Sequence, residues 1–391
     1  HLQIGDFNLL SHGGENLRMI EFINDGLMTI FFLLVGLEIK RELLVGELSS
    51  FRKAALPFIA ACGGMLLPVL IFMSICPPGS EGGQGLAIPM ATDIAFSLGV
   101  LSLLGSRVPL SLKIFLTAFA VVDDIGGILV IAIFYSSHVS YGYILVAVLL
   151  YILLYFIGKR GATNKIFFLV IGVVIWYLFL QSGIHSTISG VILAFVIPAK
   201  PRLDVGKYIE HIRHTIAGFP VMESGSIVLT NEQIAKLKEV ESASDRVISP
   251  LQSFEDNLHG AVNYLILPLF AFVNAGVVFS GGGELVGDVG IAVAAGLLFG
   301  KFAGIYFFTW LAIKIKLTPM PPGMTWTNLS GIALLGEIGF TVSLFIANLS
   351  FGANFPILLN QAKFGVLSGT ILSGLLGYIV LWIVLPARRR K

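Results

Sequence analysis

The feature that most limits the fold of this chain is its series of long apolar segments, separated by short polar ones. Of its 391 residues only 12% are Asp, Glu, Lys or Arg, about half the share found in soluble domains. Eleven segments approach the length of about 20 apolar residues with which a helix crosses a bilayer. They lie near residues 19–39, 54–75, 87–104, 110–134, 142–158, 165–181, 183–199, 260–279, 288–313, 328–350 and 362–386. We therefore expect an all-α polytopic membrane protein.

Charge and cysteine content narrow the possible partners. The 25 basic and 23 acidic residues nearly balance, so neither nucleic acid nor an acidic polymer is indicated as a partner. Cys62 and Cys76 stand in one apolar segment, too far apart along a helix to form a disulfide, and no cysteine-based metal site is expected.

The basic residues indicate the orientation of the chain in the membrane. Of the 25 basic residues, all but Arg18, Lys301 and Lys363 fall in loops on one side, which the positive-inside rule assigns to the cytoplasm. The chain then begins outside and ends inside. Because it starts with His1 and shows no signal peptide, we expect a further helix upstream, giving twelve spans in the native protein.

Two segments differ from the apolar remainder. The first residues alternate apolar and polar side chains, as an external strand or hairpin does. The segment 200–259 is rich in charge and carries a helix signal, with Thr230 and Gln233 as a capping box; we interpret it as a solvated linker, with a regulatory element as the alternative. The expected parts are an external arm (1–18), membrane helices (19–199), a cytoplasmic insert (200–259), membrane helices (260–386) and a basic cytoplasmic tail (387–391).

Ionisable residues inside apolar segments are costly and point to function. Those in the predicted spans are Asp25, Asp93, Asp123, Asp124, Lys301 and Glu337. Adjacent residues on a helix differ by about 100° in direction, so Asp123 and Asp124 face different partners, and one of them can pair with Lys301. Without Asp25, the interior set has four acids and one base. Structural ion pairs alone do not neutralise this set, so the surplus acids must hold protons or a cation.

Two of the predicted spans look discontinuous. Pro89 precedes Thr92 and Asp93 in the span near 87–104, and three glycines (Gly331, Gly336 and Gly339) interrupt the span near 328–350. Broken helices leave unpaired backbone groups that are tolerated only around a protein-lined or water-filled cavity. Asp93 and Lys301 can then neutralise the partial charges of the helix ends. The alternative is that these glycines serve only close helix packing.

The motifs closely resemble those of the NhaA-type sodium/proton antiporters of bacterial inner membranes, over nearly the whole chain. They are INDGLMTIFFLLVGLEIKREL (23–43), ATDIAFSLGVL (91–101), FLTAFAVVDDIGGI (115–128), SGIHSTISGVILAF (182–195), LPLFAFVNAGV (267–277), GKFAGI (300–305) and GFTVSLFIA (339–347). The resemblance implies inverted-topology repeats, with two broken helices that cross at mid-membrane.

The resemblance also implies roles for single residues. Asp124 is the cation-binding carboxylate, and Asp123 is a further Na+ ligand that pairs with Lys301. Thr92 and Asp93 form the broken-helix pair and join the ion-binding and proton-exchange site as further oxygen ligands. The implied pH-sensing positions are Glu38, Glu42, Glu255 and His185, and Asp25 is expected at the cytoplasmic entry or at the entry of a cavity. For the glutamates, a solvated charge network beside Lys40 and Arg41 is an equally good explanation.

The implied function is secondary active transport in the bacterial inner membrane, with Na+ or Li+ leaving the cytoplasm in exchange for external H+. Protons and sodium compete because burial favours the neutral form of a carboxyl group. We expect pH regulation, electrogenic exchange, no enzyme activity, no cofactor and a homodimer in the lipid bilayer. A sodium-coupled organic-anion symporter of similar fold is the nearest alternative; a passive channel and an intramembrane aspartyl protease are less favoured.

Three features depart from the family pattern. Glu337 stands where a small residue is expected and is a candidate extra protonation site. The insert is longer than expected, and Gly260 and Ala261 replace a Pro-Trp pair.

Overall fold

The computed structural model covers residues 1–391 and describes 3–4, 7–8, 11–12, 15–16, 19–135, 139–161, 164–200, 205–219, 228–277, 286–352 and 354–386. The described parts of the N-terminal arm form two small antiparallel hairpins. One pairs β1 (Gln3–Ile4) with β2 (Phe7–Asn8), and the other pairs β3 (Ser11–His12) with β4 (Glu15–Asn16). The basic tail lies outside the described residues.

Six helical segments are long and apolar enough to cross a membrane. They are α2 (Phe51–Ile75), α4 (Leu110–Phe134), α5 (Tyr141–Lys159), α6 (Lys165–Ser182), the unit Asp288–Lys314 and α16 (Pro356–Val384). The fifth of these is one span made of α12 (Asp288–Ala295), the π-helical segment η6 (Gly296–Lys301) and α13 (Phe302–Lys314). The protein is therefore a multi-pass membrane protein, as the sequence predicts.

Two further apolar helix pairs are bent where the sequence suggested broken spans. One pair joins Gly82–Met90 to α3 (Ile94–Leu103) at 44°, and the other joins α14 (Trp326–Leu335) to α15 (Phe340–Phe351) at 45°. The first pair begins with two short 3-10 segments, η2 (Gly82–Gly85) and η3 (Ile88–Met90). Counting each pair as one span brings the number in the described chain to eight.

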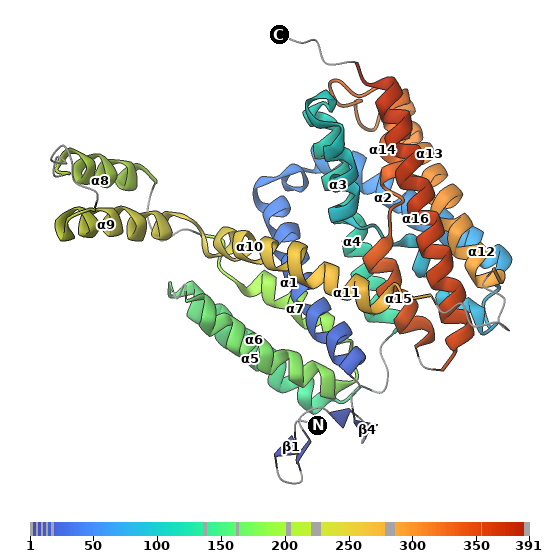
Figure 1. The fold of residues 1–391 in the computed structure, drawn as a ribbon, viewed down its shortest axis with the longest axis horizontal. Coiled ribbons are helices and arrows are strands. Elements are labelled where there is room, and N and C mark those ends of the chain that lie inside the picture. The colour runs from blue at the N-terminus through green and yellow to red at the C-terminus, as the bar shows by residue number, and fades with distance from the viewer. Residues whose placement is uncertain are drawn as a thin grey trace.

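The remaining helices of the bundle are less typical of membrane spans. They are α1 (Met19–Val45), α7 (Thr187–Val196), α10 (Pro250–Ala261), the π-helical η5 (Val262–Ile266) and α11 (Leu267–Asn274). α1 packs along α7 and α10 in the middle of the molecule (Figure 1). Because these segments do not satisfy the length and composition of a simple span, the count of eleven stays a prediction.

The charged insert forms helices of its own. α8 (Val205–Ala217) and α9 (Asn231–Val247) pack on each other and project away from the bundle (Figure 1). The predicted capping box is present: the backbone N–H of Thr230 donates to Gln233 Oε1 at 2.9 Å, and the N–H of Gln233 donates to Thr230 Oγ1 at 3.3 Å. The end of the insert is not a linker, because Leu251 and Phe254 of α10 are buried where this helix packs on α1.

Glycines bring α2 and the Asp288–Lys314 unit into backbone contact. A Cβ atom on Gly304 would lie 2.1 Å from the carbonyl oxygen of Gly63, and one on Gly300 would lie 2.7 Å from Cα of Pro68. No larger residue fits at these positions without moving a helix. This close packing fixes the depth at which the neighbouring Lys301 enters the centre of the bundle.

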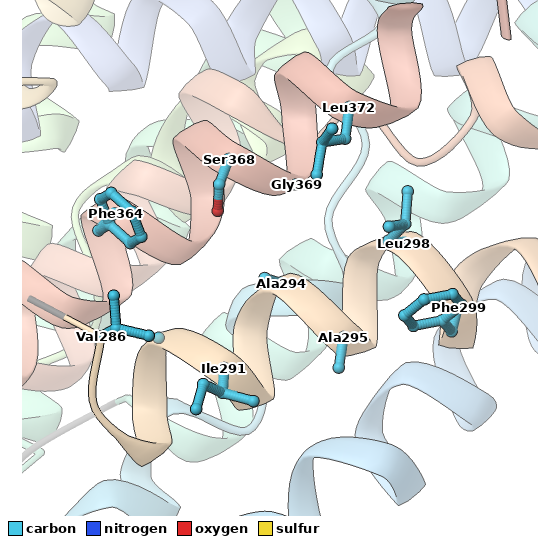
Figure 2. A pocket seen from close by; sticks show the side chains of 11 residues that line it. Val286, Ile291, Ala294, Ala295, Leu298, Phe299, Phe364, Ser368, Gly369 and Leu372 are labelled. Carbon is cyan, nitrogen blue, oxygen red and sulfur yellow. The ribbon is translucent and has the colours of Figure 1, made fainter. Parts of the chain in front are cut away.

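A groove on the outside of the bundle separates α12 from α16 (Figure 2). It has a volume of about 250 Å³, and its lining is apolar apart from Ser368. A groove of this chemistry offers no charged ligand for a cation. The charged residues of the spans lie elsewhere, around the two helix breaks.

Candidate functional site

The two helix breaks touch each other in the middle of the bundle. The backbone N–H of Asp93, in the first break, donates to the carbonyl oxygen of Ile338, in the second, at 2.6 Å. The hydroxyl of Thr92 lies 3.0 Å from the carbonyl oxygen of Gly336. Backbone groups that a broken helix leaves unpaired are thus satisfied by the other break, as an apolar surrounding requires.

Asp93 holds the N-terminal ends of both half-helices. Its Oδ1 accepts the backbone N–H of Phe96, in the first turn of α3, at 3.1 Å. Its Oδ2 accepts the backbone N–H of Thr341, in the first turn of α15, at 3.1 Å, together with the Thr341 hydroxyl. A negative charge at a helix N-terminus is stabilised by the helix dipole, and here one carboxylate serves two termini.

The C-terminal ends on the other side of the breaks receive donors. The ammonium group of Lys301 donates to the carbonyl oxygen of Met90, at the end of η3. The hydroxyl of Ser97 donates to the carbonyl oxygen of Leu335, at the end of α14, at 2.8 Å. The placement of Asp93 at positive helix ends and Lys301 at a negative one matches the arrangement suggested by their charges.

Asp123 and Lys301 form an ion pair in the protein interior. Lys301 Nζ lies 2.9 Å from Asp123 Oδ2, and both side chains are completely buried. The hydroxyl of Thr92 lies 2.6 Å from the same oxygen. The desolvation cost of such a pair offsets much of its Coulomb attraction, so a buried pair is weak support for a purely stabilising role. The sequence predicted that one of the two adjacent aspartates pairs with Lys301, and the family resemblance assigned this role to Asp123.

Lys301 ends a π-helical segment. η6 (Gly296–Lys301) interrupts the α-helical hydrogen-bond pattern immediately before the lysine. Short π-helical insertions often occur at functional sites because they redirect side chains. The π-helical segment was not predicted, and its only local signal is the pair of glycines at 296 and 300, which pack against prolines of neighbouring segments.

Asp124 differs from its neighbour because it forms no ion pair with any of the described residues. It is 5% exposed, and its Oδ2 has no hydrogen-bond partner among the described residues. Oδ1 of Asp123 is likewise buried and has no hydrogen-bond partner among the described residues. The two adjacent carboxylates therefore each present one free oxygen, and oxygen is the ligand that hard cations prefer.

Glu337 lies inside the second break and is fully buried. Neither of its carboxyl oxygens has a hydrogen-bond partner within the described chain. An ionised carboxylate in this setting is strongly disfavoured unless a charge compensates it. The sequence predicted an extra titratable group here, and the structure places it in the same break that supports Thr92 and Asp93.

A second acidic cluster lies where α1 meets α10. Arg41 donates to the buried Glu255 and lies 3.4 Å from Glu42, and His259 Nε2 lies 3.3 Å from Glu38 Oε1 and 3.6 Å from Glu255 Oε1. The acids are thus compensated by neighbouring cations. The hydrogen bond to Glu255 raises the pKa of His259, aided by the negative charge of Glu38 and opposed by partial burial.

This cluster corrects one interpretation and adds one residue. Glu255 is only 3% exposed and Glu38 only 16%, so a solvated network does not describe them. Three possible ligand atoms lie within 4.8 Å of one another: a carboxylate oxygen of Glu38, a carboxylate oxygen of Glu255 and a ring nitrogen of His259. These residues are therefore candidate cation ligands. His259 escaped the sequence analysis, although its position four residues after Glu255 on a helix is a signal for such a contact.

The structure does not bring all predicted residues together. His185 lies at the start of α7, where its ring meets Phe345 edge-on at 5.7 Å and its Nδ1 is 3.4 Å from the Thr187 hydroxyl. Asp25 lies early in α1, where its carbonyl oxygen accepts the Thr29 hydroxyl at 2.6 Å. None of these contacts joins His185 or Asp25 to the Glu38 cluster.

An amide chain that the sequence did not reveal links three helices near the breaks. Asn274 of α11 donates to Asn24 Oδ1 of α1 at 2.7 Å, and Asn348 of α15 donates to Asn274 Oδ1 at 3.0 Å. Each of these residues is an isolated polar side chain in an apolar segment. Only the tertiary contacts show that they form one network.

Comparison of the sequence with known proteins shows the family of the chain. The sequence profile of the family described as Na+/H+ antiporter 1 matches residues 4–381. The chain is 94% identical to the Na(+)/H(+) antiporter NhaA of Bacteroides thetaiotaomicron over 391 residues, covering 100% of this chain and 89% of the relative. It is 81% identical to the antiporter of the same name from Bacteroides fragilis, with 100% and 89% covered, and 45% identical to that of Koribacter versatilis, with 92% and 78% covered. The chain therefore belongs to the Na+/H+ antiporter 1 family.

Proposed function

We propose that this protein exchanges cytoplasmic Na+ or Li+ for external H+ and so serves sodium and pH homeostasis. The names of its close relatives support Na+/H+ exchange. The observation that carries the proposal is a pair of buried oxygens, one on Asp123 and one on Asp124, that have no hydrogen-bond partner among the described residues beside the crossing of the two broken helices. The organic-anion symporter has no support from these relatives, which are antiporters by name.

In this proposal a cation binds between Asp123 and Asp124. The unpaired oxygens supply two ligands, and the Thr92 hydroxyl, 2.6 Å from Asp123 Oδ2, adds a neutral oxygen beside them. Protons compete for the same carboxyl groups because burial penalises a bare negative charge. Sodium binding from one side then expels protons, and protonation from the other side expels sodium.

Asp93 contributes to the same site by holding its frame. Both of its oxygens already accept hydrogen bonds from α3 and α15, so a direct bond to the cation would compete with two helix ends. We infer that Asp93 keeps the breaks together while Asp123 and Asp124 change partners. In this scheme Asp123 leaves the positive charge of Lys301 when it turns toward the cation. Exchange is electrogenic because more than one proton crosses the membrane for each sodium ion.

The chain order supports the inverted repeats. α2, the broken η3–α3 pair and α4 form one unit, and the Asp288–Lys314 helix, the broken α14–α15 pair and α16 form another of the same order. Asp93 caps helix N-termini from both units, which suits two broken helices that enter from opposite sides. Adding α1, α7 and the η5–α11 segment to the eight spans gives the proposed eleven.

We further propose the surroundings of the site. The Glu38, Glu42 and Glu255 cluster with His259 regulates exchange by pH, while His185 acts separately from it as a modulating position. The basic loops place the C-terminus in the cytoplasm of a bacterium, with the protein in the inner membrane. The hairpins of the arm offer edge strands through which a homodimer forms, and Asp25 lines the approach from that end. No cofactor or enzymatic step enters this scheme.

Everted membrane vesicles with a respiration-generated pH gradient test the exchange. A fluorescent weak base reports the gradient while Na+ or Li+ is added. We expect sodium to collapse the gradient for the wild type and to have no effect for Asp124→Asn. Asp288→Asn is the matched control because this exposed aspartate lies at the start of α12, outside the site.

The outcomes separate the proposal from its rivals. Collapse of the gradient by sodium in wild-type and Asp288→Asn vesicles, but not in Asp124→Asn vesicles, supports exchange at this carboxylate. Lys301→Ala then reports on electrogenicity, through the dependence of exchange on membrane potential. If sodium has no effect on wild-type vesicles at any pH from about 6 to 9, the proposed exchange is wrong.

A further inference from the structure

Glu337 is a buried acid that the exchange scheme above does not use. Its side chain is 0% exposed, and both carboxyl oxygens lack hydrogen-bond partners among the described residues. It lies in the turn 336–339, which separates α14 from α15. A residue that satisfied backbone groups or filled a packing gap would not need a carboxyl group at this point.

The packing of the turn shows what Glu337 faces. A Cβ atom on Gly336 would lie 3.1 Å from Ile305, and one on Gly339 would lie 3.3 Å from Leu297. Leu297 and Ile305 stand four residues before and four residues after Lys301, close to one helical turn in each direction. The turn therefore lies across the face of the helix that carries Lys301. The lysine is also the charged group whose field acts on Glu337.

Two carboxyl groups thus belong to the surroundings of Lys301. Asp123 contacts it from α4 at 2.9 Å, and Glu337 belongs to the turn between α14 and α15 that packs against the helix of Lys301. Removing one partner of a buried ion pair leaves the other charge uncompensated, which is far more costly than the pair itself is stabilising. Any step that draws Asp123 away from Lys301 therefore needs a replacement negative charge.

We propose that Glu337 is the second counter-ion of Lys301. Glu337 pairs with Lys301 when Asp123 binds the transported cation. The role in exchange rests on the function proposed above. When sodium reaches Asp123, Glu337 releases its proton to the water on the open side, and its carboxylate takes the lysine ammonium. When sodium leaves, Glu337 regains a proton from the water on the side to which the site is then open, and Lys301 returns to Asp123. Glu337 acts as a positioning residue, because it reaches the cation only through Lys301.

Thermal unfolding of the purified full chain tests the pairing without any transport. The variants are Asp123→Asn, Glu337→Gln and the double variant, each made with Lys301 present and with Lys301→Gln. With Lys301 present, we expect the double variant to lose more in Tm than the two single losses together, because the ammonium then has no carboxylate at all. With Lys301→Gln, the two losses should add. Additive losses in both backgrounds, or an equal excess in both, would overturn the pairing.

Sodium dependence of exchange in proteoliposomes tests the role in transport. In Glu337→Gln, Lys301 has no replacement counter-ion when Asp123 turns to sodium, so sodium binding is less favourable. We expect the KM for Na+ to rise on the order of tenfold, which corresponds to a coupling energy common between neighbouring groups. Glu337→Asp should keep the KM near that of the wild type. An unchanged KM in Glu337→Gln would refute this role. Absence of exchange in the wild type would instead refute the proposed function, and the unfolding result would still decide the pairing.

Discussion

Asp93→Ala removes the acceptor that ends two half-helices at once. The change leaves the N–H groups of Phe96 and Thr341 and the Thr341 hydroxyl without the carboxylate that now accepts them. Loss of one N-cap costs about 1–2 kcal/mol, and a buried hydroxyl without an acceptor costs about 1 kcal/mol or more. Two caps and one hydroxyl together give an expected loss of about 3–5 kcal/mol.

This loss converts into a measurable change of melting temperature. With an unfolding entropy of about 2.1 cal/mol/K per residue, 391 residues give about 1.2 °C for each kcal/mol. Asp93→Ala should then lower Tm by about 4–6 °C. Asp93→Asn should lose roughly half as much, because its single amide oxygen can accept from one helix end only.

Thermal unfolding in detergent, followed by tryptophan fluorescence or by a thiol probe, measures these shifts. Ser97→Ala is the matched control, because Ser97 is equally buried and makes one hydrogen bond to the same crossing; its expected shift is about 1 °C. If Asp93→Ala melts within about 1 °C of Ser97→Ala, the carboxylate does not hold both helices, and the account of the crossing is wrong.

Three further predictions concern other parts of the molecule. Thr92→Val should raise the KM for Na+ about tenfold in proteoliposomes while Thr92→Ser retains it; equal effects would contradict a role for the hydroxyl. Because the folded-state pKa of His259 is raised, its contribution to stability is complete below about pH 6.5 and is lost as pH rises through the raised value. The Tm difference between wild type and His259→Gln should therefore be larger at about pH 6 than at about pH 9, and a constant difference would contradict it. Gly304→Ala should lower Tm and folded yield because its methyl group meets backbone, whereas Gly99→Ala, with open space around it, should be neutral or stabilising by up to about 1 kcal/mol; similar yields and Tm values would contradict the packing argument.

Much of the membrane fold is readable from local sequence. The apolar run from Leu110 to Phe134 is bounded by Pro109 and by polar residues after Tyr135, and α4 spans the predicted residues. Pro89 predicted one break, and the glycines near 336 predicted the other. These features are local because a bilayer demands long apolar helices and tolerates interruptions only where other parts of the protein satisfy the backbone.

The parts that escaped prediction depend on residues far apart in the chain. Thr341 and Asp93 are separated by 248 positions, and no period or motif connects them. α1 extends beyond the predicted end at residue 39 to Val45, because its charged last turns are covered by α10 and paired with Glu255 and His259. α7 is shorter than predicted, with the turn at His185 in place of its first residues.

The crossing also explains which of the four central acids remain uncompensated. Asp93 receives the partial positive charges of two helix ends, and Asp123 receives Lys301. Within the described residues, Asp124 and Glu337 then form no ion pair, and both are buried with oxygens that lack a hydrogen-bond partner. Because bare charges are not tolerated in such surroundings, each must hold a proton or gain a positive neighbour. Sodium at Asp124 and Lys301 at Glu337 are the two positive neighbours within the site, so binding of one sodium ion releases a proton from each of the two acids. The proposed pairing of Glu337 with Lys301 thereby gives exchange of two protons for each sodium ion, and it makes that ratio depend on a residue outside the Asp123–Asp124 pair.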